Sequence, residues 1–66
     1  MVDTQKIKEL LESRSMRQDE LADLIGVSES MVSHIFRGFK EPSVKVLKRI
    51  ADVFGVKIDD LIKEEK

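Results

Sequence analysis

Five polar residues close together in the sequence could carry the chemistry of this chain: Ser28, Glu29, Ser30, Ser33 and His34. Their hydroxyl, carboxylate and imidazole groups donate and accept hydrogen bonds, which is the chemistry needed to read base edges in a DNA groove. The same groups do not form a catalytic centre, because a lone His without a positioned nucleophile is no triad and the chain has no Cys or Tyr. We therefore expect these residues to bind a partner, and we expect no enzyme activity.

Three residues around this polar group indicate how the chain would position it. Ala22 is small enough for a second helix to cross closely, and Gly26 suits a helix end that needs a positive φ. Val32 puts a stiff, branched side chain on the inward face of the next helix. Residues 18–37 are therefore predicted to form a helix-turn-helix, with a recognition helix over about residues 28–37 and double-stranded DNA as the partner.

Apolar residues recur at helical spacing along the rest of the sequence, and no alternating apolar–polar run is long enough for a strand. The expected fold class is all-α, with one compact domain over residues 1–66 and a frayed tail at residues 63–66. Five helices are predicted, over about residues 4–13, 18–25, 28–37, 44–54 and 58–63. The side chains expected to face the core are Ile7, Leu10, Leu11, Leu21, Ala22, Leu24, Ile25, Val32, Ile35, Phe36, Val44, Leu47, Ile50, Ala51, Phe54, Ile58, Leu61 and Ile62.

The start of the second helix can be read in two ways. Ser15 could be the N-cap with Gln18 as its capping-box partner, or Arg17 could be the N-cap, which is chemically poorer. The N-caps expected for the first, third and fourth helices are Asp3 or Thr4, Ser28 and Ser43.

Length and composition limit the possible functions. With 66 residues the chain makes a single domain with a small core. It has no Cys for a disulfide or a thiolate metal site, and one His alone cannot form a metal cluster, so we expect no metal, cofactor or small-molecule ligand. No apolar run approaches the roughly 20 residues that span a bilayer, and the first ten residues lack the apolar core of a signal peptide. We expect a soluble, cytoplasmic protein.

Charge is unevenly distributed, although the net charge is only −1. Residues 28–50 contain five basic residues against two acidic ones, whereas residues 1–27 and 51–66 each contain two more acids than bases. Because phosphate binding depends on a local basic patch rather than on total charge, the middle third is the part suited to nucleic acid. Within it, we expect Lys48 and Arg49 to be solvated helix residues, with contact to DNA as the alternative.

Short motifs at fixed spacing cover nearly the whole chain, from about Ile7 to Ile62. They are Gln18-Asp-Glu-Leu-Ala22, Gly26-Val27-Ser28, Val32-Ser-His-Ile35, Arg37-Gly38, Pro42-Ser43, Leu47, Ile50-Ala51 and Gly55-Val56. Together they resemble the Cro/CI-type (Xre) helix-turn-helix repressors of phages and bacteria. The resemblance implies a compact, lambda-repressor-like domain of five helices, with the third helix in the major groove of DNA.

The resemblance also implies which residues contact DNA, and the free N–H groups at helix starts favour phosphate there. Base-edge contacts are expected from Glu29, Ser30, Ser33 and His34. Phosphate contacts are expected from Arg17, Gln18, Ser28, Arg37, Lys40 and Ser43.

Five positions are unusual for this resemblance: Arg17 and Lys57 stand where a polar helix cap is usual, and Leu11, Phe36 and Glu29 depart from the pattern as well. Family members often pair an Arg in the first helix with a Glu late in the third, and here the corresponding residues are Leu11 and Phe36. We expect an apolar contact in place of the ion pair, which removes a desolvation cost and leaves the function unchanged. Glu29 is repelled by phosphates, so we expect it to face the donor that the major groove offers, the N4 amine of cytosine.

The function expected is that of a transcriptional regulator, most simply a repressor, that binds a palindromic operator as a weak homodimer, because one helix reads only a few base pairs. The dimer interface is expected at Val56, Ile58, Leu61 and Ile62, which must also close the core. The alternative is a protein-interaction module, antitoxin-like or regulator-binding, that keeps the fold without specific DNA binding. The near-neutral charge and Glu29 favour this alternative, whereas the expected phosphate-contacting residues oppose it.

Overall fold

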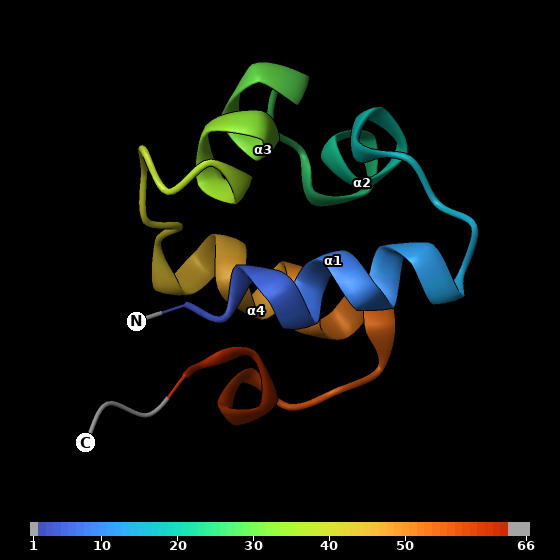
Figure 1. Cartoon of the computed structure of the whole chain (residues 1–66), viewed down its shortest axis with the longest axis vertical. Helices are drawn as coiled ribbons and strands as arrows, with labels where there is room; N and C mark the ends of the chain where they lie inside the picture. Colours follow the sequence, from blue (N-terminus) through green and yellow to red (C-terminus); the bar gives the residue numbers. More distant parts are fainter. Residues whose placement is uncertain (1, 64–66) are drawn as a thin grey trace.

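Four α-helices and one short 3-10 helix follow one another along the chain (Figure 1). The structure is a computed structural model and describes residues 2–63, so that the tail predicted to fray lies mostly outside the described residues. The described part contains no strand, only an isolated antiparallel bridge between Val2 and Ile62. The predicted all-α fold is confirmed. The elements are α1 (Thr4–Ser13), α2 (Gln18–Ile25), α3 (Glu29–Phe36), α4 (Val44–Phe54) and the 3-10 helix η1 (Ile58–Leu61).

The prediction of five helices with a last helix over residues 58–63 is wrong, because η1 is a four-residue 3-10 helix. Its N-cap is Lys57, whose side chain cannot accept a hydrogen bond from the first free N–H groups. The carboxylate of Asp60 does accept one from the Lys57 N–H, at 3.2 Å. At Ile62 the backbone turns extended, with φ −109° and ψ 129°, and pairs with Val2. So short a segment suits the tighter 3-10 geometry.

Side-chain oxygens cap three of the helices as the sequence predicts. The carboxylate of Asp3 accepts from the Lys6 N–H at 3.1 Å. The hydroxyls of Ser28 and Ser43 accept from the N–H groups three residues later, at 3.1 and 3.2 Å. Each bond satisfies one of the donors that a helix start leaves free, and so each defines where α1, α3 and α4 begin.

The start of α2 follows the alternative that looked chemically poorer. Arg17 is the N-cap, and Ser15 lies outside the helix with a positive φ of 52°. The expected capping box of Ser15 and Gln18 is therefore wrong. Instead the carboxylate of Glu20 reaches back and accepts from the Arg17 N–H at 2.9 Å. A carboxylate in the first turn also suits the positive end of the helix dipole.

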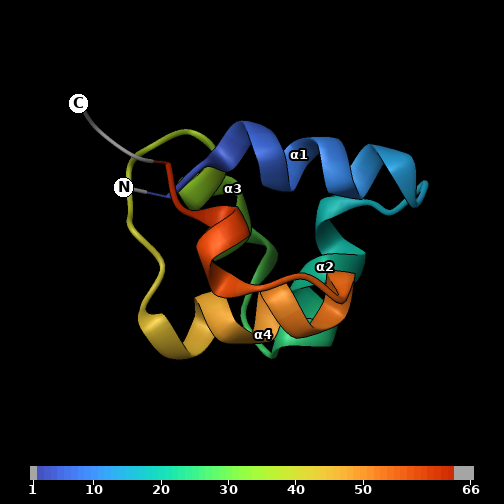
Figure 2. The ribbon, with the colours of Figure 1, turned by 90° about the horizontal axis from the view of Figure 1, so that it is seen from below.

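One core lies inside the helices, and η1 lies between α1 and α4 when the molecule is seen from below (Figure 2). Leu10, Phe36 and Ile58 are half-buried against this core, and Leu11 lies in it. The direct contact of Leu11 with Phe36 stays a prediction. The buried residues are Ile7, Leu11, Leu21, Ala22, Ile25, Val32, Ile35, Leu47, Ile50, Ala51, Phe54 and Leu61.

Three residues expected in the core are exposed instead: Leu24 (60%), Val44 (75%) and Ile62 (41%). The buried face of α2 is centred between Leu21 and Ala22, and Leu24 lies roughly 100° around the helix from it. Val44 is the first residue of α4 and precedes the first buried position by one turn. Ile62 follows the last residue of η1, in the extended segment that pairs with Val2.

Two arginines join helix ends that are distant in the sequence. Arg49 of α4 donates through Nη1 to the Ile25 carbonyl at 3.1 Å, which satisfies a free acceptor at the end of α2. This corrects the expectation that Arg49 is a merely solvated residue. Arg14 donates through Nη2 to the Phe54 carbonyl at 2.8 Å, and its guanidinium lies 5.5 Å from the centre of the Phe54 ring.

The turn between α2 and α3 depends on Gly26, which has a φ of +75°. A Cβ at this position would lie 3.3 Å from the Nη1 atom of Arg49. Both the backbone conformation and the neighbouring guanidinium therefore favour glycine, as the helix-turn-helix prediction required. The fold thus holds α3 against α2, with α4 attached to the turn between them.

None of the helices in the described part of the chain is long and apolar enough to cross a membrane.

Candidate nucleic-acid interface

An open hollow of about 270 Å³ lies over the outer face of α3 and the start of α2. All four predicted base-edge residues line it, together with two of the predicted phosphate-contacting residues. We call this set the reading face. Its residues are Gln18, Glu29, Ser30, Ser33, His34 and Arg37.

Helical geometry explains why residues of α3 meet in this hollow. Ser30, Ser33, His34 and Arg37 are spaced i, i+3, i+4 and i+7, which puts them on one side of the helix. The opposite side buries Val32 and Ile35 in the core. The polar residues are therefore held at the surface by the burial of their apolar neighbours.

The charges of the reading face are not neutralised by any residue that the structure describes. Among residues 2–63 the ion pairs all involve Arg17, so that neither Glu29 nor Arg37 has an ionic partner there. Glu29 is the first residue of α3, where the helix dipole favours a carboxylate. Its position thus has a structural reason as well as the suggested contact with cytosine.

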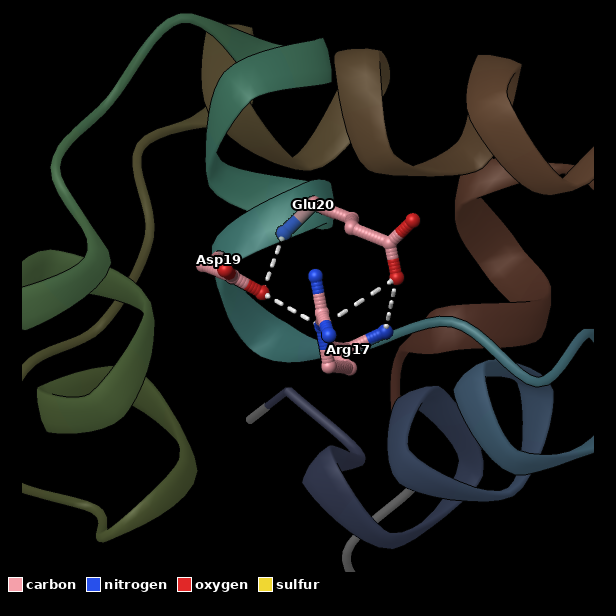
Figure 3. Close-up of polar contacts among 3 residues, drawn as sticks. All are labelled: Arg17, Asp19 and Glu20. Carbon is pink, nitrogen blue, oxygen red and sulfur yellow. Dashed lines mark hydrogen bonds and ion pairs between the residues drawn. The ribbon is translucent and has the colours of Figure 1, made fainter.

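Arg17 lies at the start of α2 but does not line the hollow. Its Nε atom lies 3.3 Å from the Asp19 carboxylate and 3.7 Å from that of Glu20 (Figure 3). The Arg17 side chain is 76% exposed, so these ion pairs add little to stability. A phosphate that approached Arg17 would have to compete with these two carboxylates.

The remaining predicted phosphate-contacting residues lie outside the reading face. Lys40 and Ser43 line a second hollow of about 290 Å³ between α3 and α4, whose other walls include the apolar residues Met31 and Val46. The Ser43 hydroxyl accepts from the Val46 N–H, which leaves its proton free to donate. Ser28 lines neither hollow, and its hydroxyl caps α3.

One residue beside the reading face, Phe39, is not among the residues predicted from the sequence to form the site. Phe39 is 74% exposed, and its ring centre lies 6.2 Å from that of His34, with the rings tilted by 59°. The available signal was an aromatic residue directly after Gly38, where the helix ends and no core position is expected.

The predicted dimer residues are only partly accessible. Leu61 is fully buried in the core, whereas Ile62 is exposed. Val56 and Ile58 line a hollow of about 370 Å³ between α4 and η1. We call the lining of this hollow the C-terminal face; it consists of Lys48, Ala51, Asp52, Val56, Lys57, Ile58 and Asp59.

Within residues 2–63, no three His, Cys, Asp or Glu side chains lie close enough together to hold a metal ion.

Comparisons with known proteins are consistent with this geometry. A helix-turn-helix family model matches residues 7–61. The chain is similar to an uncharacterized HTH-type transcriptional regulator of Methanocaldococcus jannaschii, with 38% identity over 56 residues that cover 85% of each chain. It is also similar to the HTH-type transcriptional regulator AnsR of Bacillus subtilis, with 30% identity over 92% of this chain and 53% of AnsR. The cryptic phage CTXphi transcriptional repressor RstR of Vibrio cholerae is 28% identical over 92% of this chain and 55% of RstR.

Proposed function

The chain belongs to the Xre-type helix-turn-helix family, whose relatives are named HTH-type transcriptional regulators, and from this we propose that it represses transcription by binding a palindromic DNA operator as a dimer. The observation that carries the proposal is the reading face, where six residues predicted to contact DNA line one open hollow. The buried opposite side of α3 leaves this face free to enter a major groove.

Each polar group of the reading face has a complementary group on DNA. Glu29 accepts from a cytosine N4 amine, and His34 donates to or accepts from a base edge. Ser30 and Ser33 form hydrogen bonds to bases or to bridging water. Phosphates are bound around them by Arg17, Gln18, Ser28, Arg37, Lys40 and Ser43.

Dimerisation through the C-terminal face would double the number of base pairs read. Val56 and Ile58 supply apolar contact there, the exposed Ile62 after η1 is proposed as a further contact, and Leu61 is buried in the core. The same hollow is lined by two lysines and two aspartates. A two-fold interface brings the same patch of both subunits together, so the lysines of one subunit could face the aspartates of the other. Two recognition helices would then lie about 34–36 Å apart, one turn of DNA. The interface is small, so we expect the dimer to be weak without DNA.

Repression follows from occupancy, since a dimer bound over a promoter blocks other proteins from the same DNA. The name of RstR describes that relative as a repressor.

Selection from randomised duplex DNA, repeated at low and moderate salt, tests the proposal. We expect a palindrome to be enriched, and we expect the logarithm of the binding constant to fall with the logarithm of salt by about 0.9 per phosphate neutralised. A chain that enriches no sequence even at low salt would contradict the proposal.

A protein-interaction module is the second candidate, because the net charge is −1 and a carboxylate stands at the first position of α3. This candidate predicts no salt-dependent DNA binding. The selection experiment therefore distinguishes the two.

A further inference from the structure

Phe39 is an exposed aromatic residue that the core does not need. Its side chain is 74% exposed, and it is not one of the hydrophobic residues that pack against the buried cluster. Exposing a phenyl ring to water is unfavourable, because apolar surface left in contact with water gains no stabilisation from burial. A ring in this position is therefore a candidate for contact with a partner.

The turn after α3 holds Phe39 in a defined position. Gly38 has a φ of +79°, and its N–H donates to the Ile35 carbonyl at 3.1 Å. The Phe39 N–H donates to the His34 carbonyl at 2.9 Å. This bond closes the end of the helix, and the Phe39 ring lies beside the imidazole of His34.

The partner at this position can be argued from the groups around the ring. His34 lines the reading face, so Phe39 extends that face at the end of α3. Arg37 precedes Phe39 by two residues and Lys40 follows it directly. Glu41 is the one acidic residue in the segment 37–41. Two cations within two residues of an exposed ring in the sequence, one of them lining the same hollow as His34, favour a polyanion that also carries an apolar group.

Duplex DNA carries such a group in its major groove, the C5 methyl of thymine. We propose that Phe39 is a specificity-determining residue that contacts the C5 methyl of a thymine beside the base pair read by His34. This inference rests on the proposed function, because it requires α3 to lie in the major groove. It adds an apolar contact to a reading face whose other side chains are polar.

Replacing thymine by deoxyuridine tests the contact, because the replacement removes the methyl group and leaves the hydrogen-bonding edge unchanged. The duplex would be the palindrome enriched from randomised DNA, with each thymine replaced in turn. For the unmodified protein we expect the replacement at one position in each half-site to lower the binding affinity about fourfold, which is the effect of one buried methyl group.

Three variants identify the residue responsible for the methyl contact. Phe39→Ala should bind the thymine and deoxyuridine duplexes equally at that position, and Phe39→Leu, which keeps an apolar side chain, should retain most of the difference. Leu24→Ala is the matched control, because it also truncates an exposed apolar residue but lies outside the reading face. It should keep the full fourfold difference.

Each result has a definite meaning. Phe39→Ala with the same deoxyuridine penalty as the unmodified protein would overturn the contact while leaving the proposed function intact. An enriched palindrome without a thymine at a fixed position in each half-site would do the same. A protein that enriches no sequence would remove both the contact and the function. Thermal melts of Phe39→Ala should match those of the unmodified protein, because the exposed ring supports no core residue.

Discussion

The reading face and the C-terminal face differ in how far each depends on the core. The reading face consists of polar side chains that project from a helix whose other side is buried, so its chemistry and the stability of the fold rest on different residues. The C-terminal face uses Val56 and Ile58, which also pack against the core and are supported by the buried Leu61. The outer side chains of α3 can therefore be substituted without unfolding the domain, whereas substitutions on the C-terminal face also disturb the core.

The largest effect should come from the support of the C-terminal face. Leu61→Ala leaves a cavity in the core, so we expect the free energy of unfolding to fall by about 2–5 kcal/mol, as measured by urea denaturation. His34→Ala on the reading face should change it by less than about 0.5 kcal/mol. Similar losses in the two variants would remove the distinction between the faces.

The next effect should appear in base preference. Glu29→Gln removes the charge that phosphates repel and replaces a pure acceptor by a group that also donates. We expect tighter binding to unrelated DNA and a loss of about 1–3 kcal/mol of discrimination at one C·G pair per half-site, as measured by competition with base-substituted duplexes. If the variant keeps every base preference, Glu29 contacts no base, and its remaining role is its favourable interaction with the dipole of α3.

A charge on the C-terminal face should act on dimeric binding. For Ile58→Lys we expect a loss of about tenfold, roughly 1.4 kcal/mol, on the full palindrome and little change on a single half-site. Leu24→Lys introduces the same charge at an exposed apolar residue outside this face and serves as the control. If the variant lost equal affinity for full and half sites, Ile58 would act in folding or in DNA contact and not in dimerisation.

The smallest effect should come from the rim of the reading face. Arg37→Gln should weaken binding to all sequences alike and reduce the salt slope by about 1, because one phosphate contact is lost. Lys8→Gln removes an exposed cation of α1 that lies outside the reading face, and it should leave the slope unchanged. A selective loss on one sequence would make Arg37 a base contact.

Periodicity explains which parts of the structure were predictable. The residues on the outer face of α3 could be predicted from their spacing alone, because residues three and four apart lie on the same side of any helix. The exposure of Leu24 and Val44 did not follow, because apolar spacing alone does not show how α2 is rotated against its neighbours or that the first turn of α4 lies outside the core. The wrong fifth helix has a local cause, a segment too short and too poorly capped for an α-helix.

Contacts to backbone carbonyls were invisible in the sequence for a different reason. Arg49 bonds the carbonyl of Ile25, and Arg14 that of Phe54, and any residue type offers the same carbonyl. Only the packing of α4 against the other helices selects these partners. The ring contact of Phe39 with His34 likewise depends on the path of the chain after Gly38.

The pairing of Val2 with Ile62 has a consequence for engineering. The Asp3 N–H also donates to the Leu61 carbonyl at 2.8 Å, so the two ends of the described chain are held side by side. A short peptide linker could join them and close the backbone into a ring without disturbing α3. Because a ring has far fewer unfolded conformations than an open chain, cyclisation should raise the melting temperature of so small a domain.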